Sequence, residues 1–338
     1  MPFKMLNLQC RIEIRSKNTQ KTVTFDYANS IEVKTSCENL TDTATVKVPR
    51  KMQWKGKSLL DYVNRNDEIT IWAGYKEYGM EKLFKGYVNS VENGIPIVIT
   101  CENEMRLFKT TEVKAEVIEN FDLVAFLHRY VPGLKVECPD TIDFGEVTVE
   151  ANTLSGFLDK LREQFDWFYG YFQDGTFYAL INKKQFSQYN TLTFDPTRNL
   201  INDSLKYTLA EDVKVAVKAT HINRDNTKIE VTVPDETGDC NMQHFYFPEY
   251  DTEAALKEAA EKKLKELKCD KMEGTIEAFG VPFVRKGDVV RLRDSERPER
   301  DGKRFQVTAV DYKFSTSGYR QTITLGAELK SELQTNIA

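Results

Sequence analysis

Two stretches of this 338-residue chain carry the same β pattern. Each begins with an aspartate and an alternating run, DEITI from Asp67 in the first and DVVRL from Asp288 in the second. A phenylalanine follows 17 residues after each aspartate, at Phe84 and at Phe305. Alternation with a period of two places one face of a strand on a core and the other face in water. The pattern therefore predicts one three-stranded meander that is used twice.

A third strand completes each copy, in residues 97–101 and 321–325. The interval from the phenylalanine to the central residue of this strand, Ile99 or Ile323, is 15 residues in the first copy and 18 in the second, which a hairpin loop three residues longer explains. We therefore expect the copies to differ in what they touch at the second hairpin, residues 309–323. The positions predicted to form the repeated core are Ile69, Ile71 and Phe84 in one copy and Val290, Leu292 and Phe305 in the other.

The chain is long enough for two or three domains, and its pattern changes twice along its length. Residues 1–108 alternate as strands do, residues 109–195 mix helix and hairpin signals, and residues 196–330 return to strands. Residues 331–338 are typical of a frayed tail. The expected fold class is mainly β with an α+β insert, in which two similar β-barrel-like domains flank a small α+β module.

Three helices are predicted. Asn120 and Asn152 are suited to cap two of them, because a side-chain oxygen there accepts an exposed backbone N–H. Asp251 begins the third helix, near 252–268, ahead of the last strands of the second β domain. The helix after Asn152 has one apolar stripe, typical of a single buried face. This stripe is formed by Leu154, Phe157, Leu158, Leu161 and Phe165.

Composition excludes several classes of protein. Hydrophobic residues make up 41% and charged residues 29%, a globular balance. The net charge of −5 argues against a dedicated nucleic-acid binder, which usually carries a basic excess on one face. No apolar run approaches the roughly 20 residues that span a bilayer. The first residues have no apolar core of a signal peptide, so we expect synthesis in the bacterial cytoplasm and no membrane insertion.

The motifs of catalysis are missing. The sequence has three histidines and no GxSxG, so a nucleophile beside a base has no support. Ser155 falls in the first turn of a predicted helix, and His128 lies at the edge of an apolar stripe. No glycine-rich phosphate loop occurs. We therefore expect no enzymatic activity. A glycosidase that uses paired carboxylates stays open, because 52 acidic residues always offer candidates.

The six cysteines are scattered, and the numbers of the closest two, Cys10 and Cys37, differ by 27. The absence of CxxC excludes a zinc ribbon or a redox motif, and reduced core thiols are expected. Cys240 and His244 are four positions apart and could face one metal ion. No nearby pair completes the four ligands that zinc needs, so neither a metal nor a cofactor is expected.

Three local patterns resemble one known family, the tail-hub proteins of contractile phages of the late control D type. Residues 67–101 carry the strand order and the segment LFKGYV; residues 154–180 are similar to the family's insertion module. Residues 253–326 carry an alanine-rich helix, then EGTIEAFGVP, KGDVV and GYRQTI. The hub part of type VI secretion spike proteins is related to this family.

The resemblance implies a structural baseplate hub. A homotrimer would place six similar β-barrel-like domains around a channel and adapt a six-fold tail tube to a three-fold spike. The implied partners are tail-tube and baseplate proteins and a spike that is a separate polypeptide. The implied location is a virion tail, a prophage product or a related contractile injection particle. No specific binding to nucleic acid is implied.

A second hypothesis is a secreted, β-rich carbohydrate-binding or adhesin module. Such a module needs exposed aromatic platforms, for which the candidates are Trp54, Trp72, Tyr75 and Tyr78. The missing signal peptide argues against this hypothesis, and glycan binding by the isolated protein would favour it.

Overall fold

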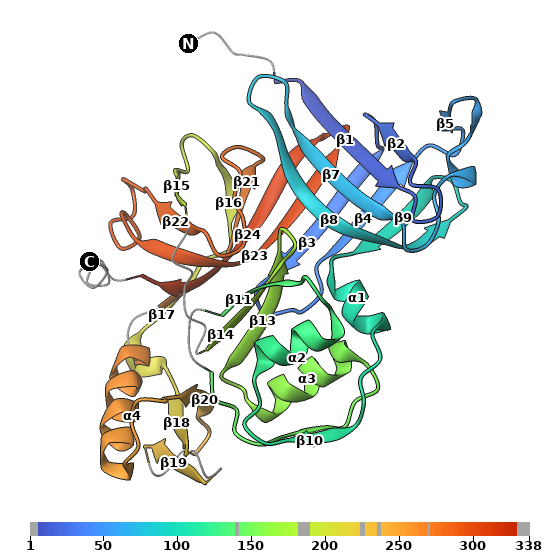
Figure 1. Ribbon diagram of the computed structural model, residues 1–338. Coiled ribbons are helices and arrows are strands. Elements are labelled where there is room, and N and C mark those ends of the chain that lie inside the picture. Colours follow the sequence, from blue (N-terminus) through green and yellow to red (C-terminus); the bar gives the residue numbers. More distant parts are fainter. Residues whose placement is uncertain are drawn as a thin grey trace. The chain divides into compact units, whose positions relative to one another are not determined.

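The computed structural model describes residues 6–138, 142–181, 190–223, 227–234, 238–268 and 271–329 (Figure 1). The chain divides into two compact units. The first combines Met1–Arg106, Phe186–Leu205 and Glu273–Ala338, and the second combines Leu107–Gln185 with Lys206–Met272. The first unit holds both β segments of the repeat, and the second holds the inserted helices and small sheets. The predicted domain boundaries, 1–108, 109–195 and 196–330, stay a prediction.

A first array, formed by the N-terminal part of the chain, has six main strands and the additional strand β2. In space the strands follow the order β3-β4-β9-β8-β7-β1, with β2 beyond β1. Every neighbouring pair is antiparallel. The strands are β1 (Leu8–Arg15), β2 (Thr22–Phe25), β3 (Ser30–Ser36), β4 (Thr43–Val48), β7 (Glu68–Tyr75), β8 (Gly79–Glu92) and β9 (Ile97–Glu102). Between β4 and β7 lie the short β5 (Gln53–Trp54) and β6 (Lys57–Ser58).

A second array repeats this arrangement near the C-terminus. Its order is β16-β21-β24-β23-β22-β15. Numbered by their place in the chain, the strands of both arrays follow the order second, third, sixth, fifth, fourth, first. One pair differs: β15 runs parallel to β22, whereas β1 is antiparallel to β7. The strands are β15 (Thr191–Phe194), β16 (Leu200–Asp203), β21 (Lys271–Phe279), β22 (Val289–Leu292), β23 (Arg304–Ser315) and β24 (Gly318–Glu328).

A buried aspartate begins the repeated meander in each array. Asp67 is 1% exposed and Asp288 is 7% exposed. In each, Oδ2 accepts the backbone N–H three residues earlier, at 2.8 Å in both arrays. Oδ1 accepts an N–H from the end of the first strand, from Lys17 after β1 at 2.9 Å and from Asn190 before β15 at 3.2 Å. A buried carboxylate needs such donors, so each aspartate fixes its turn to a neighbouring strand.

The residue before each aspartate has the same unusual backbone. Asn66 has a φ of 71° and Gly287 a φ of 89°, the left-handed region that glycine and asparagine tolerate best. Their N–H groups donate to the carbonyls of Val88 and Val307, at 2.8 Å in both cases. The ladder to the sixth strand shifts register immediately after each of these valines. The turn, the valine and the bulge together fix the structural correspondence between the arrays.

This correspondence corrects the alignment made from spacing. Phe305 lies opposite Val290, whereas Gly86 lies opposite Ile69, the counterpart of Val290. Phe305 therefore holds the place of Gly86 and not that of Phe84. The equal spacing of 17 residues was misleading, because the path from the aspartate to the matching valine is two residues shorter in the second array. Sequence periodicity alone does not record such a change in a loop.

The second hairpin also differs from its prediction. The first hairpin closes with Glu92 opposite Val98, and the second closes with Ser315 opposite Gly318, which leaves only two residues in the turn. The prediction of a longer loop was wrong. The extra residues lengthen the ladder between β23 and β24 relative to that between β8 and β9, because each additional cross-strand pair adds hydrogen bonds that a loop would leave to solvent.

The second unit contains the inserted elements. α2 (Leu123–Tyr130) and α3 (Leu154–Gln164) meet through Phe126 and Phe157, whose ring centroids are 4.8 Å apart. A three-stranded sheet has the order β11-β14-β13, and β10 pairs with β12. These strands are β10 (Glu116–Ile118), β11 (Lys135–Glu137), β12 (Val147–Val149), β13 (Phe168–Gln173) and β14 (Thr176–Ile181). The predicted fold class, mainly β with a small α+β insert, is confirmed.

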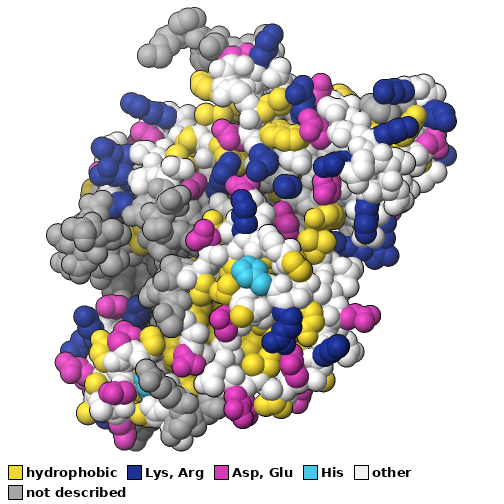
Figure 2. Space-filling view, viewed as in Figure 1, with side chains coloured by type: hydrophobic (Ala, Val, Ile, Leu, Met, Phe, Trp, Pro, Cys, Tyr) yellow, Lys and Arg dark blue, Asp and Glu magenta, His cyan; other side chains and the backbone are white. Residues whose placement is uncertain are grey.

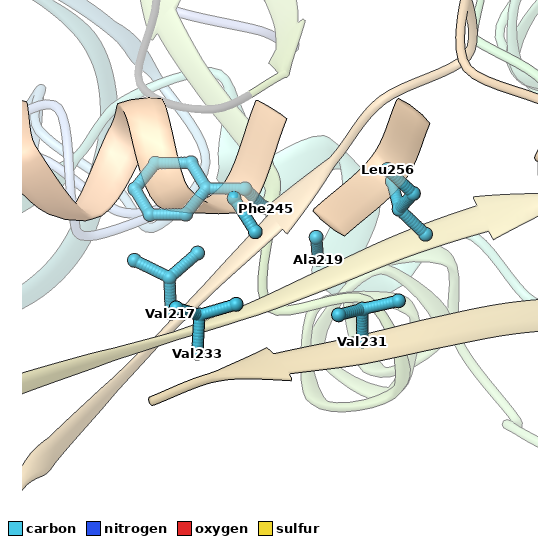
Figure 3. Close-up of a cluster of buried hydrophobic side chains, with 7 residues drawn as sticks. Val217, Ala219, Val231, Val233, Phe245 and Leu256 are labelled. Atoms are coloured by element: carbon cyan, nitrogen blue, oxygen red, sulfur yellow. The ribbon is translucent and has the colours of Figure 1, made fainter. Parts of the chain in front are cut away.

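A separate sheet carries the long helix, α4 (Glu253–Leu267). The sheet has the order β19-β18-β20, from β18 (Val215–Ile222), β19 (Lys228–Val233) and β20 (Asn241–Tyr246). Figure 3 shows the apolar layer between them: Leu256 of α4 faces Ala219 and Val231 of the sheet. The remaining short elements are α1 (Met105–Thr110) and β17 (Lys206–Thr208).

The helix caps fall one or two residues later than predicted. Asp122, and not Asn120, accepts the N–H of the first turn of α2. Thr153 caps α3 in place of Asn152, and Thr252 caps α4 in place of Asp251. In each case the capping oxygen must lie three residues before the N–H that it accepts. A neighbouring polar residue of the right type satisfies the sequence signal but not this geometry.

Candidate assembly surface

The two arrays are joined by a strand pair. The outer half of β23 lies alongside β3, from Ala309 opposite Ser36 to Ser315 opposite Ser30. Thr35 Oγ1 also donates to the carbonyl of Val310, at 3.0 Å. The lengthened second hairpin makes this contact, so the copies differ here in what they touch. The result is one sheet that runs through both arrays, with orange and red strands beside blue ones in Figure 1.

A buried ion pair lies beside this seam. The Lys286 ammonium, in the second array's aspartate turn, is 2.6 Å from Oδ2 of Asp42 in the β3–β4 loop. Their side chains are 4% and 9% exposed. Lys286 also donates to the carbonyl of Ser36, at 3.2 Å. Burial raises the pKa of Asp42, and the neighbouring ammonium and the Ser36 N–H act against that rise. The pair fixes one array to the other through a contact that is costly to break.

A tyrosine pair joins the arrays at another point. The Tyr75 hydroxyl donates to the carbonyl of Tyr319 at 3.1 Å, and the two ring centroids are 5.9 Å apart. The ring of Tyr319 lies against the backbone of Gly280, where an added Cβ would overlap it. Glycine is therefore required at position 280 for this packing. The seam between the arrays is apolar at this point and ionic at Lys286.

The exposed face of the joined sheet is polar and mixed in charge. Opposite charges lie across from each other on neighbouring strands: Asp311 faces Lys34, and Arg320 is 3.3 Å from Glu277. Figure 2 shows Lys and Arg side chains interspersed with Asp and Glu over the face in view. Paired charges of opposite sign create little net potential at these positions.

The residues predicted to form the repeated core are buried. Their exposed fractions are at most a few per cent: Ile69 1%, Ile71 0%, Phe84 4%, Val290 0%, Leu292 3% and Phe305 0%. These residues hold the arrays together and present nothing to a partner. The polar residues at the seam were not predicted. Asp67 and Asp288 began the two aligned runs, yet only the structure reveals their shared hydrogen bonds.

The histidines considered as candidate bases or metal ligands lie beside oxygen atoms of other residues. No group of three metal-ligating side chains occurs in the described ranges. His244 Nδ1 lies 3.2 Å from an Asp166 carboxylate oxygen, and His128 Nε2 lies 2.9 Å from the carbonyl of Leu134. Burial raises the pKa of the Cys10 thiol to about 11, so it stays protonated and unreactive at neutral pH.

The described aromatic residues among those proposed as a carbohydrate platform differ in exposure. Tyr75 is 5% exposed and is part of the seam, whereas Tyr78 is 62% exposed. Their rings meet edge to face, with centroids 6.5 Å apart. Trp72 is half-buried in β7, and the Trp54 side chain lies outside the described part of the structure. Among the described helices, none has the length and apolar character to cross a membrane.

Solved structures with this arrangement come from phage tails and from a secretion system. A 43 kDa tail protein of prophage MuSo2 from Shewanella oneidensis superposes with a TM-score of 0.58 at 13% identity, covering 94% of this chain and 97% of its own. A tail protein from Neisseria meningitidis gives 0.59 at 12% identity, covering 94% and 96%. The chain has the fold of phage tail proteins.

A third structure extends the comparison to secretion. An Escherichia coli component of the type VI secretion system, described as structurally similar to two T4 bacteriophage tail proteins, gives a TM-score of 0.55 at 10% identity. The superposition covers 93% of this chain and 76% of that one. No protein-family model matches the sequence, and neither does any curated protein. The likeness to phage tail proteins therefore lies in the fold, which extends over nearly the whole chain.

Proposed function

We propose that the protein is a structural baseplate hub of a phage tail or of a related contractile injection particle. It is made in the bacterial cytoplasm and assembled into the particle as a homotrimer, without enzymatic turnover. Its partners are the tail tube, baseplate proteins and a separate spike protein. The fold shared with tail proteins along 94% of the chain supports a role in such a particle.

The observation that carries the proposal is the duplicated array. The two arrays share strand order, aspartate turn and bulge, so one chain offers two similar units in tandem. Units related by a head-to-tail contact form a ring when their rotation closes. Three chains supply six such units while keeping three-fold symmetry. That is the geometry needed between a six-fold tube and a three-fold spike.

The test is the mass of the native assembly. The chain is produced alone and together with the proposed spike protein, and native mass spectrometry counts the chains. We expect three chains of 39.0 kDa, with the spike either strengthening or being required for their association. A chain that remains monomeric in the presence of its spike, at micromolar concentration and low salt, contradicts the proposal.

A further inference from the structure

The seam uses the β23 edge of the second array and the β3 edge of the first array. The corresponding edge of the other array is left unpaired in each case within the described part of the chain. Within the chain, β23 of the second array pairs with β3 of the first. Their counterparts are β8 and the edge formed by β16 and β17, both of which pair with β21. Among the described strands, β16 and β17 each pair with β21 alone, and β8 has no partner beside its last residues on the side away from β9. Exposed strand edges of this kind pair with another chain unless they are protected.

We propose that the partner of these edges is a second copy of this chain, whose β17 pairs with the last residues of β8. This inference rests on the proposed ring of hubs and names the surface through which one chain meets the next. The contact within the chain is head-to-tail, from the second array to the first. The same contact can repeat between chains, from the first array of one chain to the second array of its neighbour. In a closed ring both strand edges are then paired in every chain.

The bulge gives the register on the β8 side. Glu92 lies four residues after Val88, and Asp311 lies four residues after Val307, the matching valine of the second array. Glu92 and Asp311 are therefore counterparts. Within the chain, Asp311 lies directly opposite Lys34 of β3. A basic residue is thus expected opposite Glu92 in the contact between chains.

The register on the β16 side follows from a row of cross-strand partners. In each array the row begins at the acidic residue and crosses three strands to the edge. The rows are Glu92, Val98, Lys47 and Ser30 in the first array, and Asp311, Thr322, Glu277 and Asn202 in the second. Asn202 therefore corresponds to Ser30. Counting four residues onward along the chain from each, Lys206 corresponds to Lys34.

The predicted neighbours are complementary in charge. Glu92 would lie opposite Lys206, as Asp311 lies opposite Lys34, and both Glu92 and Lys206 are exposed. Opposite charges that face each other across antiparallel strands stabilise the pair, and like charges destabilise it. The mixed-charge face of the joined sheet would continue across this contact.

The adjoining positions also suit an interface. Tyr207 follows Lys206 and leaves 44% of its surface exposed. In the proposed register it lies opposite Val91, which is half-buried. Arg65, the counterpart of Lys286 in the first array's aspartate turn, is exposed, whereas Lys286 is buried in the seam. The first array thus presents outward a cation at the same position of the turn that the second array uses inside the chain.

Charge reversal tests the pairing. Glu92→Lys and Lys206→Glu are each introduced into the full chain, and the dissociation constant of the oligomer is measured by analytical ultracentrifugation. Each reversal is expected to weaken association roughly tenfold, because an attraction becomes a repulsion. The double variant restores it. Matched controls are Glu119→Lys and Lys262→Glu, two exposed charges outside the proposed pairing that should leave association unchanged.

A cross-link gives a second readout that does not depend on electrostatics. Chains carrying Glu92→Cys are mixed with chains carrying Lys206→Cys and oxidised. Facing residues of an antiparallel pair lie within disulfide range, so a covalent dimer should form in the mixture and in neither variant alone. If the wild type is trimeric but neither the reversals nor the mixture has an effect, the proposed pairing is wrong and the hub function stands. If the wild type never associates, the hub function itself fails.

Discussion

The two aspartate turns allow a direct test of whether the arrays are structurally equivalent. Asp67 and Asp288 each accept two backbone N–H groups with the same carboxylate oxygens, and both are buried. Replacing either by alanine leaves two donors without an acceptor. Hydrogen bonds to a charged group contribute roughly 1.5–3 kcal/mol each, and the variant no longer buries a carboxylate, which offsets part of the loss.

We therefore expect Asp67→Ala and Asp288→Ala each to lower the free energy of unfolding by about 2–4 kcal/mol. The corresponding asparagine variants keep one acceptor oxygen and should lose about half as much. Chemical denaturation measures the loss. Hydrogen exchange locates it: β7 should exchange faster in the Asp67 variant, and β22 in the Asp288 variant.

An exposed acidic residue provides the control. Glu119→Ala should change the free energy of unfolding by less than about 0.5 kcal/mol. The reasoning is refuted if one aspartate variant loses several kcal/mol while the other stays within that limit. Such a result would mean that these hydrogen bonds contribute differently to the free energy of unfolding in the two arrays, and that the arrays are not equivalent at their turns.

Two further predictions concern charged side chains. Lys286→Ala should cost about 3–5 kcal/mol in a denaturation experiment, because it leaves the buried carboxylate of Asp42 without its cation; Lys286→Met combined with Asp42→Leu should recover most of that loss. The Thr197 hydroxyl and N–H hold the pKa of Asp195 below its usual range, so this contact stabilises the fold above the ordinary carboxyl pKa and is lost as pH falls. In Thr197→Val the pKa of Asp195, followed by NMR, should rise; an unchanged titration would contradict this.

The repeat itself was readable from the sequence, because both copies keep the period-two alternation that a half-buried strand requires. Its register was not. Phe84 and Phe305 share a spacing but not a position, since a loop shortened by two residues moves the strand and no local pattern records it. The fold class followed from the same periodicities, and α4 was predicted to within one residue at each end.

The seam between the arrays was beyond sequence reasoning. Lys286 sits in an ordinary Lys-Gly-Asp turn and Asp42 in a polar loop, about 240 residues away, and neither neighbourhood marks a buried ion pair. The pairing of β23 with β3 joins segments from opposite ends of the chain. Such contacts depend on how whole arrays pack, whereas periodicity reports only which face of one strand is buried.

The central claim is that the duplicated arrays of several chains form one ring. Single-particle electron microscopy of the purified assembly, viewed end-on, tests it most directly. The account predicts six similar β lobes around a central opening, arranged with three-fold symmetry because alternate lobes come from different arrays. Two lobes of an isolated chain, or a two-fold dimer in which identical arrays face each other, would contradict it.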